Sequence, residues 1–252
     1  MSLEVDFFPM QPLSKVKPNC KTTSWGIDPV MLLRPAAAVR VAQYIAEWSE
    51  IENLLGLFLG ILLHANQKAA LAIYSDLDNR SAQLRIIESA ARATLSQEHY
   101  ETVSVLLTYE IRPAMRYRDK LAHWCWGCSI ELPDALILRE PSDKLINLAN
   151  FVELQKLGQP ISGDIPLNHD TLYVITVDDL DRSLHQIADI RGRLITAIGG
   201  VWDKNTIEVR SSLLNQLAET PQLRSALNRL AAKRKKSEVL RPSSPEEPSG
   251  IS

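Results

Sequence analysis

The segment "MRYRDKLAHWCWGC" (Met115–Cys128) concentrates side chains that can take part in chemistry. It holds a histidine, several basic residues, one carboxylate and two cysteines. An imidazole exchanges protons near neutral pH and can act as a general base, and a guanidinium can hold a phosphate through two hydrogen bonds. The two cysteines add the alternatives of a redox pair and of a metal site.

The basic residues around this segment have helical spacing. Arg112, Arg116 and Lys120 recur every four positions and therefore form one stripe on a helix, with His123 at the end of that helix. A local cationic strip results. On spacing alone the alternative is a solvated face, in which His123 is favoured by the negative C-terminal end of the helix dipole.

The cysteines favour packing over redox or metal chemistry. In thioredoxin-like sites the first cysteine lies where a strand meets a helix N-terminus, whereas Cys125 and Cys128 follow a helix and lead into a strand-like stretch. A structural zinc site needs four ligands, and these two cysteines with His123 supply only three, because Cys20 is distant in the sequence. We therefore predict no metal and no cofactor, with the cysteines packed among the neighbouring tryptophans.

The stretch "IRPAMRYRDKLAHWCWG" resembles the motif-bearing helix of HEPN domains (higher eukaryotes and prokaryotes nucleotide-binding). Within it, "RDKLAH" is similar to the Arg-x4-His form of that family's Arg-x4-6-His motif. Bacterial members commonly read Arg-Asn-x-x-Ala-His-Gly at this point. The resemblance spans roughly residues 40–200 and includes the order of long helix, short helix, helix and motif-bearing helix.

The resemblance implies a metal-independent ribonuclease that acts as a homodimer, with the arginine and histidine of two protomers facing one cleft. Those catalytic roles fall on Arg118 and His123. The histidine would remove the proton of a ribose 2′-hydroxyl, and the arginine would stabilise the charge that develops on the attacked phosphate. On an ideal helix the two residues point about 140° apart, so we expect a dimer cleft or unwinding at the helix end to bring them together. We also expect the motif-bearing helix and its neighbours to hold the dimer.

Other residues of the segment take supporting roles under the same resemblance. Lys120 would support catalysis, and Arg112 and Arg116 would bind RNA. Asp119 stands where the family frequently has asparagine, so it adds negative charge beside a polyanion or instead orients the histidine. Members modified by nucleotidyltransferase antitoxins often carry tyrosine two positions after the histidine; Cys125 occupies that position, so this modification is not predicted.

Apolar periodicity predicts the elements that must position these residues. A long helix is predicted over residues 34–65, and a helix over 97–123 carries the motif, with Pro113 kinking it or marking a break. After it, "WCWGCSIEL", "ALILRE" and "TLYVITV" read as three short strands. The predicted fold class is mainly α, a HEPN-like bundle of about four to five helices with a small antiparallel β insertion after the motif helix.

The chain is predicted to have four consecutive parts. They are an extended N-terminal arm (1–33), a HEPN-like helical domain (34–202) with a β insertion at about 124–177, a C-terminal helical extension (203–236) and a disordered tail (237–252).

Composition limits the partners. The net charge of −2 gives no global attraction to polyanions, so RNA binding must come from a local patch. The most apolar run, "IENLLGLFLGILLHA", is shorter than the roughly 20 residues that a bilayer requires, which predicts no membrane association. The N-terminus lacks the pattern of a secretory signal and the cysteine count is odd, so we expect a cytoplasmic protein.

Two functions follow as expectations. The first is a dimeric, metal-independent RNA endonuclease of HEPN type in a defence or toxin–antitoxin system, with an antitoxin or regulatory protein as a further partner. The second is a catalytically silent HEPN-like module that binds a nucleotide, an RNA or a protein.

Overall fold

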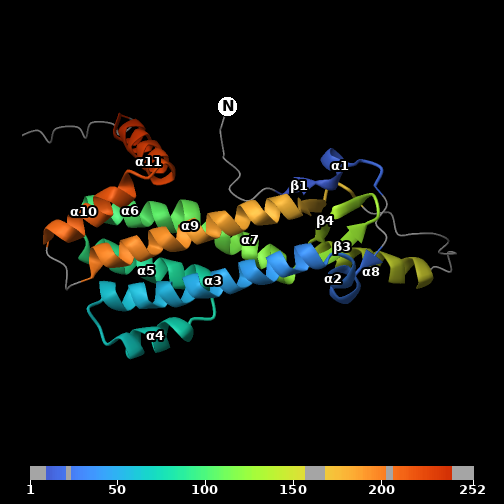
Figure 1. The fold of residues 1–252 in the computed structure, drawn as a ribbon, viewed down its shortest axis with the longest axis horizontal. Helices are drawn as coiled ribbons and strands as arrows, with labels where there is room; N and C mark the ends of the chain where they lie inside the picture. Colours follow the sequence, from blue (N-terminus) through green and yellow to red (C-terminus); the bar gives the residue numbers. More distant parts are fainter. Residues whose placement is uncertain (1–9, 21–23, 157–167, 203–206, 240–252) are drawn as a thin grey trace, which may run out of the picture. The chain divides into compact units, whose positions relative to one another are not determined.

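A computed structural model describes residues 10–20, 24–156, 168–202 and 207–239 (Figure 1). The chain is mainly helical and has one small antiparallel sheet of five strands. This confirms the coarse fold class predicted from sequence. The described residues form more helical segments than the four to five expected, because helices also occupy the N-terminal residues, the β region and the C-terminal part.

Contacts divide the chain into two compact units that are interleaved along the sequence. The first contains residues 1–57 and 110–195, and the second contains residues 58–109 and 196–252. The division therefore falls within two long helices, α3 (Pro35–Leu62) and α9 (Val177–Val201).

The sheet belongs to the first unit and has the strand order β1-β5-β4-β3-β2, with every neighbouring pair antiparallel. The three strands predicted from sequence are its central members, and two short strands from the N-terminal residues add its edges. In chain order the strands are β1 (Gln11–Pro12), β2 (Ser24–Trp25), β3 (Cys125–Ser129), β4 (Leu132–Arg139) and β5 (Leu172–Thr176).

The remaining helices of the first unit are α1 (Leu13–Val16), α2 (Ile27–Leu33), α7 (Arg112–His123) and α8 (Pro141–Lys156). Helix α8 was not predicted from the sequence. One face of the sheet packs on Leu13 of α1 and on Cys20, and Ala135, Ile137 and Val174 contribute from the strands. The alternation of these strand positions is the reason why one face is continuous and apolar.

The kink or break expected near Pro113 takes the form of a π-helical turn. The turn η1 (Leu107–Ile111) ends directly before α7, and Pro113 lies in the first turn of that helix. Leu107 and Ile111 keep helical dihedral angles, so the π-helical turn is an irregularity within a continuous helical run, and Pro113, which has no backbone donor, follows it.

The second unit contains the helices α4 (Gln67–Ser75), α5 (Arg80–Thr94), α6 (Gln97–Leu106), α10 (Ile207–Ala218) and α11 (Pro221–Val239). Asn66 and Asn79 cap the starts of α4 and α5 by accepting hydrogen bonds from backbone N–H groups two and three residues ahead. The disordered tail expected at 237–252 begins inside α11, and the part beyond Val239 lies outside the described residues. Among the described helices, none combines the length and apolar character needed to cross a bilayer.

Candidate active site at the end of α7

Buried tyrosines fix the position of α7. The Tyr44 hydroxyl of α3 donates to the Ala114 carbonyl at 3.3 Å, and its ring meets the Tyr117 ring edge-on with centroids 5.1 Å apart. The Tyr117 hydroxyl accepts a 3.1 Å hydrogen bond from Ser183 of α9. Burial raises the pKa of Tyr117, which the bond from Ser183 opposes, and burial also raises the pKa of Tyr44. Both phenols therefore stay neutral, and α7 is held between α3 and α9.

The structure brings the two candidate catalytic residues together within one chain. His123 is the last residue of α7 and is exposed, and Trp124 after it is extended, with ψ at 153°. Arg118 Nη1 lies 3.3 Å from His123 Nε2 and 3.1 Å from Asp119 Oδ1. The long arginine side chain spans the angular separation that an ideal helix imposes, so a second protomer is not needed to join the pair.

The Arg118–His123 contact determines which ring nitrogen carries the proton. A guanidinium only donates hydrogen bonds, so His123 Nε2 must accept and the proton of a neutral imidazole must be on Nδ1. The lone pair that could take a proton is thus covered by Arg118 in this arrangement. Asp119 bonds to the same Nη1 group and partly neutralises it.

Arg118 is mostly buried, with 15% of its side chain exposed. Its Nε is buried and has no hydrogen-bond partner among the described residues. A guanidinium held in this way cannot swing freely into solvent. The Nη1 atom of Arg118 contacts His123 at the C-terminal end of α7.

The basic residues predicted to form a stripe on α7 have different surroundings. Arg116 is exposed and Arg112 is half-buried, so both remain available to a polyanion. Lys120 instead lies over two aromatic rings, with Nζ 5.0 Å from the Trp124 centroid and 5.5 Å from the Tyr173 centroid. These two rings are 5.5 Å apart and tilted by 55°. Lys120 is therefore part of a cation–π cluster beside His123.

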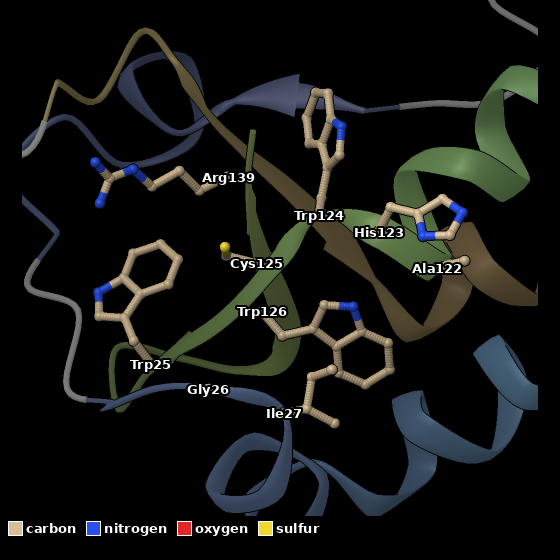
Figure 2. Close-up of a pocket in the computed structure, with 9 residues that line it drawn as sticks. All are labelled: Trp25, Gly26, Ile27, Ala122, His123, Trp124, Cys125, Trp126 and Arg139. Carbon is tan, nitrogen blue, oxygen red and sulfur yellow. The ribbon is translucent and has the colours of Figure 1, made fainter. Parts of the chain in front are cut away.

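A pocket of about 320 Å³ opens on His123. Figure 2 shows the lining residues around strand β3, with His123 on one side and Trp25 and Arg139 on the other. They come from the N-terminal residues, the end of α7 and two strands: Trp25, Gly26, Ile27, Ala122, His123, Trp124, Cys125, Trp126 and Arg139.

Local contacts hold the aromatic walls of the pocket in place. The Trp126 indole N–H donates to the Leu121 carbonyl in the last turn of α7 at 3.0 Å. Trp25 lies against Gly127, where a Cβ atom would be 2.7 Å from the Trp25 ring. Only glycine at this position lets the indole approach the strand so closely. Arg139 donates to the Asp143 carbonyl at 2.6 Å.

An ion pair lies directly before α7. Glu110 of the π-helical turn is 2% exposed, and its Oε2 accepts a 2.6 Å bond from Arg193 Nε of α9. Its other oxygen, Oε1, is buried without a hydrogen-bond partner among the described residues. Burial raises the pKa of Glu110, and Arg193 only partly opposes this effect.

The three cysteines differ in burial. Cys20 and Cys128 are buried, and Cys125 is half-buried in the pocket wall. Within the described ranges, no three histidine, cysteine or carboxylate side chains gather to hold a metal ion.

Sequence reasoning missed the residues that complete this site from elsewhere. Trp25 comes from β2, and Arg139 and Tyr173 come from β4 and β5. The tryptophans beside the motif were predicted only to pack. Spacing gave no signal for the other three, because sheet pairing brings them to α7 across long sequence separations.

Comparisons of the chain with protein-family models, with curated proteins and with solved structures find no match.

Proposed function

We propose that this chain is a metal-independent RNA endonuclease of HEPN type that acts as a dimer. The observation that carries the proposal is the exposed His123 at the end of α7 with Arg118 Nη1 3.3 Å from its Nε2. A general base beside a fixed cation is the pairing required to deprotonate a hydroxyl next to a phosphate. The Arg-x4-His spacing, which resembles the HEPN motif, also supports the proposal. In this proposal the helices α3, α7 and α9 correspond to the HEPN-like bundle.

The proposed reaction is an internal transesterification. His123 Nε2 takes the proton of a ribose 2′-hydroxyl, and the 2′-oxygen attacks the adjacent phosphorus. The bond from phosphorus to the 5′-oxygen of the next nucleotide breaks, that oxygen takes a proton from water, and His123 returns its own proton to the solvent. The products are a 2′,3′-cyclic phosphate and a 5′-hydroxyl end, and no metal takes part.

In this proposal, substrate binding exposes the lone pair of His123 Nε2, the general base. Arg118 donates to Nε2 in the free chain, so the lone pair is covered until a phosphate competes for the guanidinium. A phosphate also competes with Asp119 for the same Nη1 group. Binding of the strand, with help from Arg112 and Arg116, thus prepares His123 to accept a proton.

The test is a time course with labelled RNA in EDTA. His123→Ala should lower cleavage by roughly two to four orders of magnitude while RNA affinity changes little, because only acid–base catalysis is removed. Arg118→Ala should lower both, and Arg118→Lys should not restore the wild-type rate, since an ammonium lacks the planar fork. His185→Ala, at an exposed histidine of α9, is the matched control and should cleave at the wild-type rate.

Two results would contradict the nuclease proposal. One is equal cleavage by wild type and His123→Ala. The other is cleavage of a substrate whose 2′-hydroxyl at the cut site has been replaced by hydrogen.

The second candidate is a catalytically silent HEPN-like module that binds a nucleotide, an RNA or a protein. The observation that favours it is the double engagement of Arg118, which donates to both Asp119 and His123. An arginine neutralised in this way stabilises transition-state charge less well. RNA binding without cleavage by any variant across a broad panel of RNAs would select this function.

A further inference from the structure

The pocket beside His123 is built mainly from indole rings. Trp25, Trp124 and Trp126 all contribute to its wall, with Ile27 as an apolar neighbour. Trp126 is buried and bonded to Leu121, and Trp25 is seated on Gly127, so these walls are formed before any ligand arrives. In Figure 2 Trp126 and Ile27 lie together on one side of β3. Preformed aromatic walls suit a flat ring, which stacks on indole faces with little reorganisation.

The size of the pocket fits one such ring with its sugar. Its volume of about 320 Å³ is at the lower end of the roughly 300–1,000 Å³ typical of small-molecule sites. A folded peptide segment or a long ligand would not fit inside. A single nucleoside of an RNA chain would fit inside the pocket, and the rest of the RNA would lie outside it.

One cationic side chain lines the pocket and two others lie next to lining residues, which favours a ring attached to an anion. Arg139 forms part of its wall, and Lys120 lies 5.0 Å from the ring of Trp124, which is itself a lining residue. Arg118 is held against His123, another lining residue. An aromatic ring linked to phosphate is the chemistry of a nucleotide, and single-stranded RNA is recognised by stacking of bases on aromatic side chains.

From this geometry we propose that the pocket binds the nucleobase of the nucleotide whose ribose is presented to His123. The inference rests on the proposed ribonuclease function in so far as the base belongs to an RNA strand. The base lies against the indole rings that line the pocket, and the attached ribose and phosphate lie at His123 and Arg118. The pocket then fixes the position of the 2′-hydroxyl relative to the general base, which is the orientation that catalysis requires.

Ribonucleoside 3′-monophosphates test the pocket without cleavage. Each of the four is titrated against the full chain while tryptophan fluorescence is recorded, with ribose 5-phosphate as the ligand that lacks a base. Trp25→Leu should weaken nucleotide binding roughly tenfold, since stacking on one aromatic face is lost, and Trp25→Phe should recover most of it. Trp202→Leu removes an exposed tryptophan outside the pocket lining and should bind like wild type.

Alkylation of Cys125 gives a second readout that needs no variant. Cys125 is half-buried in the pocket wall, whereas Cys20 and Cys128 are buried, so iodoacetamide should modify Cys125 first. A bound nucleotide should slow this modification several-fold in mass spectra of the intact chain and its peptides. Ribose 5-phosphate should not.

The outcomes separate this inference from the nuclease proposal. If nucleotides bind in a base-dependent way and protect Cys125 from alkylation, but no RNA is cleaved, the nucleobase pocket is supported and the nuclease proposal is rejected. If cleavage depends on His123 but Trp25→Leu binds nucleotides and cleaves RNA like wild type, the nuclease proposal is supported and the nucleobase pocket is rejected. Absence of nucleotide binding at millimolar concentration, or equal binding of ribose 5-phosphate, would also overturn the inference.

Discussion

At the scale of single residues, the site depends on how Arg118 divides its hydrogen bonds. Its Nη1 group donates to Asp119 and to His123, and its Nε is buried without a described partner. The carboxylate and the imidazole therefore compete with any incoming phosphate. Asp119 also stands where HEPN domains, which this segment resembles, frequently have asparagine, so its effect on this balance can be measured by that substitution.

We predict that Asp119→Asn increases RNA affinity and cleavage several-fold. The variant removes a negative charge 3.1 Å from Arg118 Nη1 and leaves a neutral acceptor, so the guanidinium is freer to bind phosphate. Affinity is measured by RNA titration at fixed salt, and cleavage by the time course in EDTA.

Asp78→Asn is the control for removing one exposed carboxylate outside the site. It should leave both quantities unchanged. A loss of cleavage in Asp119→Asn would contradict the prediction and would indicate that Asp119 orients His123, the alternative left open by the sequence.

At the scale of elements, α7 is positioned by its two neighbours and by the irregular turn that precedes it. Tyr44 and Ser183 hold its buried face, and Glu110 of η1 pairs with Arg193 of α9. Breaking a buried ion pair by removing one partner typically costs about 3–5 kcal/mol, because the other charge stays buried. The pair therefore connects the turn that ends at Ile111 with α9 and helps to fix where α7 begins.

We predict that Glu110→Gln changes the pH dependence of stability. The pKa of Glu110 is raised above its ordinary 4.5, chiefly by burial, so the folded chain holds this proton more tightly than the unfolded chain. Its contribution to the free energy of unfolding is fully present below pH 4.5 and is lost as pH rises through the raised value. Chemical denaturation of wild type and Glu110→Gln at several pH values above 4.5 measures the difference.

The stability of wild type relative to Glu110→Gln should fall as pH rises across this window. Glu98→Gln, at an exposed carboxylate of α6, should follow the wild-type profile. Parallel profiles for wild type and Glu110→Gln would contradict the raised pKa.

At the scale of the whole molecule, the proposed dimer needs an apolar contact. The unburied side of α7 presents Arg112, Arg116 and Asp119, and burying these charged groups in an interface would remove their hydration. Exposed apolar side chains of the first unit gather instead on α2, namely Ile27, Met31, Leu32 and Leu33. We therefore expect α2, rather than the motif-bearing helix, to provide most of the apolar area, since stable interfaces bury about 800 Å² per partner.

We predict that wild type is a dimer at micromolar concentration and that Leu32→Asp shifts it towards monomer. Leu32 is 83% exposed, so a charge there should leave the fold intact while it opposes burial of α2. Light scattering measures the mass. Ile73→Asp on α4, where the side chain is 59% exposed, is the matched control and should remain dimeric. A wild-type monomer would contradict the dimer, and a dimer unaffected by Leu32→Asp would exclude α2 as its contact.

The sequence by itself indicated the long helices, the three central strands and the candidate pair Arg118 and His123. Periodicity predicted the long helices, and alternation predicted the three central strands, because both patterns reflect which residues face an apolar interior. Pro113 indicated the irregularity that the π-helical turn provides. Arg118 and His123 lie within one helix, and the resemblance of "RDKLAH" to the HEPN motif nominated them. The ideal-helix angle gave no indication that a long side chain would join them.

Only the tertiary structure decided what surrounds that pair. Trp25 reaches the site because β2 pairs with β3, and Arg139 and Tyr173 reach it through β4 and β5. The Glu110–Arg193 pair joins η1 to α9 in the same non-local way. Strand pairing and helix packing depend on contacts between residues far apart in the chain, whereas sequence periodicity reports only on near neighbours. The pocket, the cation–π cluster and the covered state of His123 Nε2 therefore emerge only when the chain is folded.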